Sequence, residues 1–242
     1  MKFYSLTGRN LKEVYRDPVT SLLGLGMPII LLVLFASIHK NIRLEIFSPQ
    51  SLTPGIIVFC YAFLIMFSAI LLAKDRQSSF LIRLFTTPLK PSDYILSYTV
   101  PFIPAAFFQA VVCMIVGTIL GATFTHIVGT FLFFILFSIT CISIGIIVGS
   151  LFTVNQVSGI GSLIITAISL FSGAWMDLKM VGGIFETIGY ALPFAHAVDA
   201  SKKLLSGSGI SDVSGSLLIV LIYTVILFVT AILSFRWAMK RV

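Results

Sequence analysis

The sequence predicts an all-α membrane protein with six transmembrane helices, and both its composition and its hydropathy pattern support this fold class. Of the 242 residues, 58% are hydrophobic and 10% are charged, whereas a soluble domain carries about 25% charged residues. The mean hydropathy is +1.08, so the chain has too few polar residues to cover a water-exposed body of this size. Apolar runs near or above the ~20 residues that cross a bilayer recur along the chain. We expect one transmembrane domain over residues 1–242.

The N-terminal segment, residues 1–18, has the pattern of a helix that lies in the membrane interface. Within Phe3–Arg16, apolar and aromatic side chains share one side of the helix, and charged side chains occupy the rest. Asp17 and Pro18 end this helix, with Asp17 able to cap the next helix and Pro18 in its first turn. The apolar side comprises Tyr4, Leu11, Val14 and Tyr15, and the charged side comprises Arg9, Lys12, Glu13 and Arg16.

Six predicted spans follow the interfacial helix. Pro28 lies inside the first span and is expected to kink it, because membrane helices tolerate an internal proline. Gly145 and Gly149, four residues apart in the fourth span, let helix backbones approach closely, either within one subunit or between subunits. The spans are Val19–Ile38, Pro54–Ala73, Tyr94–Ala122, Val128–Phe152, Val157–Trp175 and Leu217–Phe235.

The flanking charges predict the orientation of the spans. Eleven of the 16 Lys and Arg residues flank the spans on the side of the N-terminus, and five flank them on the other side. Because positively charged flanks are favoured in the cytoplasm, both termini are predicted to be cytoplasmic, in a multi-pass protein of the bacterial cell membrane. The same flanks explain the net charge of +7 through contact with anionic headgroups of the lipid bilayer, and no nucleic-acid partner is indicated.

The segment Lys74–Lys90 is the longest charge-rich interruption in the first two-thirds of the chain. Its apolar residues fall on one face at helical spacing, and Pro88 ends the pattern by pushing Thr87 out of helical geometry. We therefore expect a short amphipathic helix at the membrane surface, whose polar face needs a partner. The apolar face comprises Phe80, Leu81, Leu84 and Phe85, and the other faces carry Asp75, Arg76, Ser79, Arg83 and Thr86.

The last external segment, residues 176–215, is too long for a turn and too apolar for an ordinary loop. Two short helices, Val181–Leu192 and Ala195–Leu205, are predicted on either side of a break at Pro193. Neither is long enough to span, so the pair indicates a re-entrant hairpin, with an ordinary pair of surface helices as the alternative. Within this segment Glu186, His196 and Asp199 either have a role in the re-entrant fold or are simply solvated.

The chemistry of a membrane enzyme is missing from the sequence. The three histidines, His39, His126 and His196, are far apart and lie near span ends, and no charged residue lies inside the predicted spans. Such residues mark ion pathways, because they are costly at membrane depth. The sequence also has no GxxxxGK[ST] motif, so energy for uphill transport would have to come from another polypeptide. The three cysteines lie in apolar runs and are expected to be small hydrophobic residues.

Two aromatic residues near the outer end of the fifth span have two interpretations. Trp175 fits an aromatic belt at the membrane interface. Alternatively, Phe171 and Trp175 line an exit path for an amphipathic substrate.

The pattern resembles the membrane permease subunits of type-2 ATP-binding-cassette exporters over nearly the whole chain. The resemblance starts at Arg16-Asp17-Pro18 and has its centre in Lys74-Asp75-Arg76, followed by the segment from Ile82 to Leu89. It continues through Phe171-Ser172-Gly173 and Leu192-Pro193-Phe194 to the stretch from Ala197 to Leu205.

The resemblance implies that residues 74–90 form a coupling helix that docks on a cytoplasmic ABC ATPase subunit. Two permease subunits, identical or homologous, would enclose the route. ATP and Mg would be bound by the ATPase subunit, and this chain would bind no cofactor and no metal. The residues expected to contact the ATPase are Lys74, Asp75, Arg76, Ser79, Arg83, Thr86, Thr87 and Pro88.

The function expected from the sequence is therefore that of a permease, not an enzyme, in an ATP-driven exporter of an amphipathic drug, antibiotic or peptide. Two alternatives remain open at this point. One is a permease that exports a lipid or a polysaccharide, and the other is an immunity-type membrane protein that moves no cargo.

Overall fold

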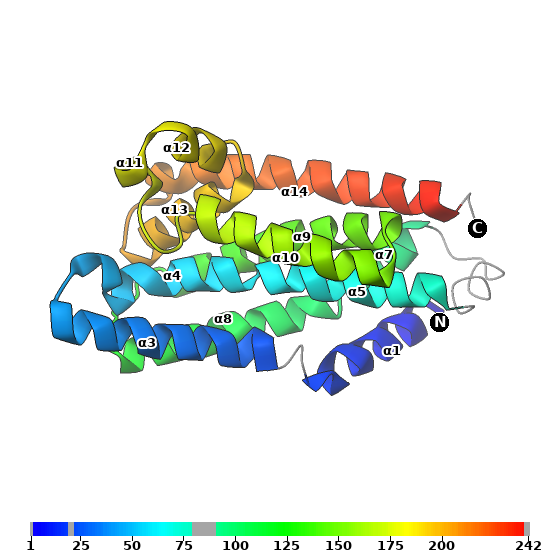
Figure 1. Ribbon diagram of the computed structural model, residues 1–242, viewed down its shortest axis with the longest axis horizontal. Helices are drawn as coiled ribbons and strands as arrows, with labels where there is room; N and C mark the ends of the chain where they lie inside the picture. The colour runs from blue at the N-terminus through cyan, green and yellow to red at the C-terminus, as the bar shows by residue number, and fades with distance from the viewer. Residues whose placement is uncertain (1, 19–21, 79–90, 240–242) are drawn as a thin grey trace.

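The computed structural model describes residues 2–18, 22–78 and 91–239, and these residues fold into helices with no strand. The helices run along one long axis, and the N- and C-termini lie at the same end (Figure 1). The first half comprises α1 (Lys2–Arg16), the π-helical turn η1 (Leu22–Gly26), α3 (Met27–Ile42), the 3-10 turn η2 (Glu45–Phe47), α4 (Pro49–Cys60) and α5 (Ala62–Gln77). The second half comprises α7 (Pro91–Thr99), α8 (Phe102–Ile119), α9 (Ile127–Leu151), α10 (Val154–Phe171), α11 (Leu178–Val181), α12 (Gly183–Tyr190), α13 (Pro193–Leu205) and α14 (Ile210–Met239).

The six predicted spans are confirmed, because six helical stretches among the described residues are long and apolar enough to cross a membrane. Their bounds differ from the prediction at several ends, where polar residues continue a helix beyond its apolar run. The stretches are Leu22–Ile42, Pro49–Gln77, Asp93–Ile119, Ile127–Leu151, Val154–Phe171 and Ser211–Ala238.

Two prolines lie near the starts of helices. Pro28 lies in the first turn of α3, directly after the π-helical turn η1 and inside the span Leu22–Ile42, and the kink expected at this residue stays a prediction. Pro101 follows the break between α7 and α8, so the third span consists of two helices. Both effects follow from the missing N–H of proline, which is tolerated best in a first helical turn.

The α4–α5 pair is the central span of the bundle. In its apolar window 89% of the residues are buried, against 11% for Leu22–Ile42 and 17% for each of Val154–Phe171 and Ser211–Ala238. Figure 1 shows α4 and α5 running through the middle of the molecule, with α3 on one side and α9, α10 and α14 on the other. The outer spans therefore expose long apolar faces that only lipid or another subunit can cover.

Two glycines allow α9 to approach α5 closely. A Cβ atom built on Gly145 would lie 2.0 Å from Ser68 Oγ and 2.4 Å from the carbonyl oxygen of Ile65. A Cβ atom on Gly149 would lie 2.6 Å from the carbonyl oxygen of Ala69. This pair of small residues thus serves packing within the chain, one of the two interpretations that the sequence left open.

A hydrogen bond joins α9 to α14. The Thr140 and Thr224 hydroxyl oxygens lie 2.6 Å apart, and Thr224 also donates to the carbonyl oxygen of Val220 at 2.7 Å. Both threonines are buried, so the pair satisfies polar groups that apolar surroundings would otherwise penalise.

The segment from α11 to α13 packs at the end of the bundle opposite the termini (Figure 1). Helices α12 and α13 correspond to the two helices predicted there, Pro193 begins α13 as its first residue, and α11 is an additional short helix. One side of α13 is buried, including Phe194, Ala197 and Val198, and α13 contacts α4 and α14. A position within the membrane remains a prediction for this segment.

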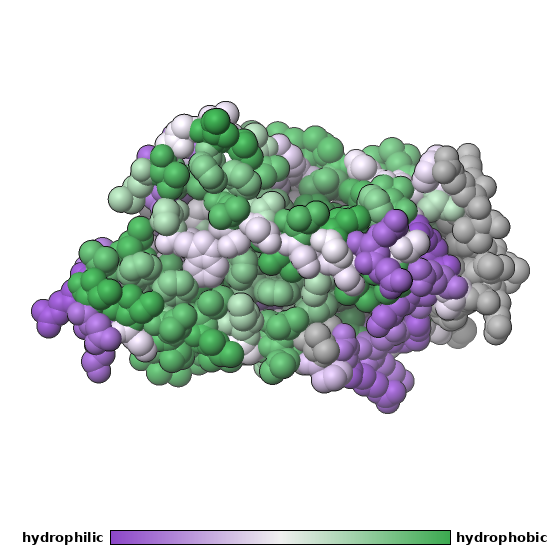
Figure 2. Space-filling model, viewed as in Figure 1, coloured by the Kyte–Doolittle hydropathy of each residue, from purple (hydrophilic) through white to green (hydrophobic). Residues whose placement is uncertain are grey.

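The surface has the distribution expected of a membrane protein. On the face drawn in Figure 2, hydrophilic residues gather at the two ends of the long axis, and hydrophobic residues cover most of the length between them. One hydrophilic group covers the region of α1, and the other lies at the end where α3 leads to α4.

We expect Gly145→Ala to lower the free energy of unfolding by about 1–3 kcal/mol, because the new methyl group meets the backbone of α5 and forces α5 and α9 apart. The matched control is Gly129→Ala, since Gly129 is an exposed residue of the same helix, and nothing lies within 4 Å of the position that its methyl group would take. Thermal unfolding of the purified variants in detergent checks the difference. Equal stabilities of the two variants would contradict the close α5–α9 contact.

Candidate functional site

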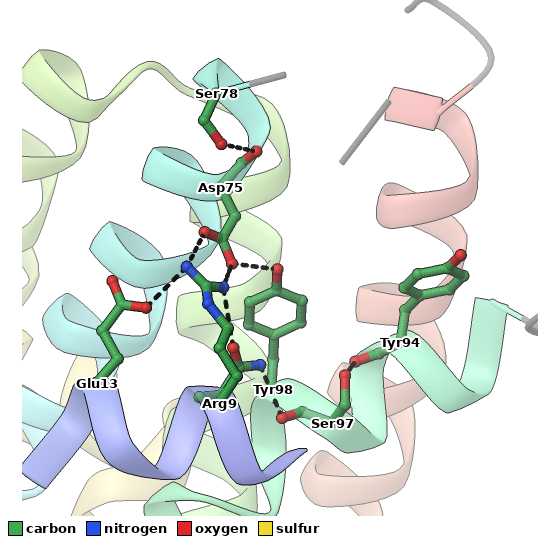
Figure 3. A network of polar contacts seen from close by, with 8 residues as sticks. Arg9, Glu13, Asp75, Ser78, Tyr94, Ser97 and Tyr98 are labelled. Atoms are coloured by element: carbon green, nitrogen blue, oxygen red, sulfur yellow. Dashed lines mark hydrogen bonds and ion pairs between the residues drawn. The ribbon is translucent and has the colours of Figure 1, made fainter. Parts of the chain in front are cut away.

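A polar network joins α1 to the end of the bundle where α5 stops and α7 begins. Figure 3 shows Arg9 of α1, Asp75 of α5 and Tyr98 of α7 pointing toward one another. Along the chain, Arg9 lies 66 positions before Asp75, and Tyr98 lies 23 positions after it. This network lies directly before residues 79–90, which carry most of the predicted coupling helix.

Asp75 is the centre of the network. It is 3% exposed, and its carboxylate accepts hydrogen bonds from both terminal nitrogens of Arg9, with Nη2 at 2.7 Å from Oδ1. The Tyr98 hydroxyl donates to Oδ2 at 2.6 Å. A buried carboxylate is costly without a cation and hydrogen-bond donors, and here it has both.

Arg9 bridges two acidic residues. Its Nη2 lies 2.8 Å from Oε2 of Glu13, one helical turn further along α1. The hydrogen bond to Asp75 raises the pKa of Arg9, and the negative charges of Asp75 and Glu13 act in the same direction against the lowering effect of burial. Arg9 thus stays charged and holds α1 on α5.

Asn10 adds a second attachment of α1. Its side chain is fully buried, its Nδ2 donates to the backbone carbonyl oxygen of Ser97 at 3.0 Å, and its Oδ1 accepts from Arg9 at 3.1 Å. The buried face of α1 comprises Leu6, Asn10 and Val14, which recur every four residues. The predicted apolar side is therefore divided, since Val14 is buried whereas Tyr4 and Tyr15 are 78% and 58% exposed.

The first residues of the predicted coupling helix belong to the last turn of α5. Lys74 is exposed, and Arg76 donates to the backbone carbonyl oxygen of Phe152 at 2.9 Å, just after the C-terminus of α9. Asp75 is among the residues expected to contact the ATPase. In the structure its carboxylate is instead buried and hydrogen-bonded to Arg9 of the same chain.

The remaining coupling-helix residues lie outside the described residues, so contact with an ATPase and packing on the membrane domain both stay predictions for them. They are Ser79, Phe80, Leu81, Arg83, Leu84, Phe85, Thr86, Thr87 and Pro88.

The two aromatic residues of the predicted exit path are both engaged in ring contacts. Trp175 packs against Phe35 and Phe59, with ring centroids 5.4 and 5.0 Å apart, and its Nε1 donates to Ser169 Oγ at 3.0 Å. Phe171 stacks on Phe185 of α12 with centroids 5.5 Å apart. Within this chain these rings join α3, α4, α10 and α12, and their role in an exit path remains a prediction.

Two of the four residues singled out in the external segment meet around Tyr190. The Tyr190 hydroxyl donates to Asp199 at 2.7 Å, and Nε2 of His196 lies 3.0 Å from the backbone oxygen of Tyr190. Burial, followed by the hydrogen bond to Asp199, raises the pKa of Tyr190. Pro193 is buried and begins α13, whereas Glu186 is half-buried on α12. These contacts hold α12 on α13.

In the described part of the chain, no group of three His, Cys, Asp or Glu residues could hold a metal ion. Sequence reasoning missed Arg9 and Tyr98 as partners of Asp75, and it missed the contact of Asn10 with Ser97. A polar Asn on the face between Leu6 and Val14 was the signal for a polar contact of α1, but it could not identify the partner.

We expect Arg9→Met to lower the free energy of unfolding by about 2 kcal/mol, because it leaves the Asp75 carboxylate buried without its cation. This is below the roughly 3–5 kcal/mol of a fully buried pair, since the Arg9 side chain is 36% exposed. Lys12→Met is the matched control on the same helix, because Lys12 is exposed. Equal thermal stabilities of the two variants would show that the Arg9–Asp75 contact does not hold α1.

Comparison with known proteins gives a consistent assignment. The transport permease ycf38 of Pyropia yezoensis is 24% identical over 215 residues, which cover 84% of this chain and 73% of that protein. The transport permease ycf38 of Porphyra purpurea is 28% identical over 120 residues, which cover 48% of this chain and 41% of that protein. A family model described as ABC-2 type transporter matches residues 1–206. Because this match spans most of the chain, the chain belongs to the ABC-2 type transporter family.

Proposed function

We propose that this chain is the transmembrane subunit of an ATP-driven exporter that moves an amphipathic drug, antibiotic or peptide out of the cell. Family membership makes the chain a membrane transport component. Hydrolysis of ATP would take place on a separate ABC ATPase subunit that binds ATP and Mg, because the sequence has no GxxxxGK[ST] motif of its own. Two permease subunits would enclose the route.

The observation that carries this proposal is the polar face of α10. Asn155, Ser158, Gly159, Ser162 and Thr166 are exposed and share one side of this apolar helix. Figure 2 shows a pale strip crossing the hydrophobic surface where α10 lies in Figure 1. The opposite side of α10, with Val157, Gly161 and Ile168, is buried in the bundle.

The hydroxyl groups of this face are bonded only locally. Ser162 donates to the carbonyl oxygen of Ser158 at 3.0 Å, and Thr166 donates to that of Ser162 at 2.9 Å. Their oxygens keep acceptor capacity that lipid cannot use, whereas water or a polar cargo can. A membrane-spanning helix with such an exposed face is suited to line a route between two subunits.

The contact with the ATPase is proposed at the C-terminal end of α5. Lys74 and residues 79–90 would dock on the ATPase, and α1 would lie beside them through its contact with Asp75. The excess of Lys and Arg on the side of both termini supports a cytoplasmic position of this end in a bacterial cell membrane.

A cysteine scan tests the route. We expect Ser162→Cys to react with a water-soluble methanethiosulfonate reagent in membranes, because the α10 face would contact water. Val225→Cys, 56% exposed near the middle of α14, is the matched control and should stay unreactive in lipid. The native Cys60, Cys113 and Cys141 are buried and give little background. If the two variants are labelled equally slowly, the α10 face does not contact water, and α10 no longer supports the proposed route.

A second test concerns the coupling segment. We expect Arg83→Glu to reduce co-purification with a co-expressed ABC ATPase subunit at least tenfold, because the substitution reverses a charge of the proposed docking face. The control is Lys40→Glu, because Lys40 is an exposed residue near the C-terminal end of α3. This variant should leave co-purification unchanged. Intact binding of Arg83→Glu, or absence of any ATPase from the purified wild-type protein, would reject the coupling proposal.

A further inference from the structure

A groove on the outer surface of the bundle runs from the charged side of α1 into the apolar region. Its inner part is a cavity of about 250 Å³ between α1, η1, α5 and α8. Its outer part is a cavity of about 290 Å³ that shares Val14 and Phe67 with the inner one and reaches Glu13 and Lys74. The two cavities therefore adjoin along α5.

The described walls of the inner cavity are mostly apolar, and the polar side chains among them are Tyr15 and Gln109. Its walls include Leu25, Phe63, Leu64 and Phe67, and Phe108 is 54% exposed at its margin. Gln109 also lines this cavity, although only 2% of the residue is exposed, and its Nε2 has no hydrogen-bond partner among the described residues. A buried amide without a partner costs free energy. Water would be poorly held there, because an ordered water needs two to four polar partners.

The outer end of the groove is positively charged. Lys12, Arg16 and Lys74 are exposed and line a shallow depression that continues the outer cavity. The described part of the chain gives these three cations no ion pair, whereas the Glu13 carboxylate in the same depression is paired with Arg9. Asp17 lines it as well, so the depression retains an excess of positive charge.

We propose that this groove binds a single-chain amphipathic anion with a hydroxyl group near its apolar end. The acidic head would contact Lys12, Arg16 and Lys74, and the apolar body would lie along Val14 and Phe67. The hydroxyl group suits Gln109, because it can accept from Nε2 and donate to Oε1. From Lys74 to Phe63, 11 residues along α5, the groove extends about 16 Å, which is about half of a bilayer's hydrocarbon core.

Binding of two probes to the full chain in phosphatidylcholine nanodiscs tests the proposal. The probes are radiolabelled 12-hydroxydodecanoate and dodecanoate, which differ only in the terminal hydroxyl group, and empty nanodiscs give the background. We expect the wild-type protein to bind the hydroxylated probe about fivefold more tightly, as one net hydrogen bond allows. Gln109→Leu should bring the ratio of the two dissociation constants close to one, whereas Gln77→Leu, at an exposed amide on α5, should leave the ratio unchanged.

The charged end is tested separately. Arg16→Gln combined with Lys74→Gln should weaken both probes by a similar factor and preserve their ratio. Gln109→Leu removes an unpaired buried polar group, so it should fold at least as stably as the wild type, and thermal unfolding checks this. Equal affinities of the wild type for the two probes, no saturable binding, or an unchanged ratio in Gln109→Leu would overturn the proposal. The measurement uses neither ATP nor an ATPase, so its failure is distinct from a failure of the transport proposal.

Discussion

The need to neutralise one buried carboxylate organises the end of the bundle where both termini lie. Asp75 lies in the last turn of the central span, where a carboxylate without a cation would be too costly to bury. Arg9 supplies the cation and fixes α1 across the bundle, while Tyr98 brings in the start of the third span. Three segments far apart in the sequence thus meet where residues 79–90 leave α5. Whatever binds this end of the molecule meets α1 and α5 as one connected unit.

Away from this end, the bundle depends on close backbone contact at its centre and leaves its periphery open. The glycines of α9 allow contact with the backbone of α5, whereas few residues of α3, α10 and α14 are buried. For α3 and α14 the exposed side chains are largely apolar, as lipid requires. The exposed surface of α10 combines a polar stripe with the exposed Leu163 and Leu170, and the polar stripe is the part of the periphery that is most in need of a partner other than lipid.

The six spans could be predicted because hydropathy over ~20 residues is a local property that tertiary contacts hardly change. Long-range pairing could not be predicted. The pattern placed Arg9 with the solvated charges and Asp75 with the ATPase contacts, since nothing in the local sequence shows that residues 66 positions apart meet. The role of Pro28 also depended on context, because η1 ends just before it. The aromatic contacts of Trp175 and the unpaired amide of Gln109 likewise arise only from the packing of several helices.

The Arg9–Asp75 ion pair is expected to hold α1 on the bundle. A double-mutant cycle tests it most directly, with Arg9→Met, Asp75→Asn and the double variant compared by equilibrium unfolding in mixed micelles. If the ion pair stabilises the protein, the double variant loses less stability than the sum of the single variants, with a coupling free energy of about 1–3 kcal/mol. Strictly additive losses would contradict it, because they would show that the two side chains stabilise the protein independently.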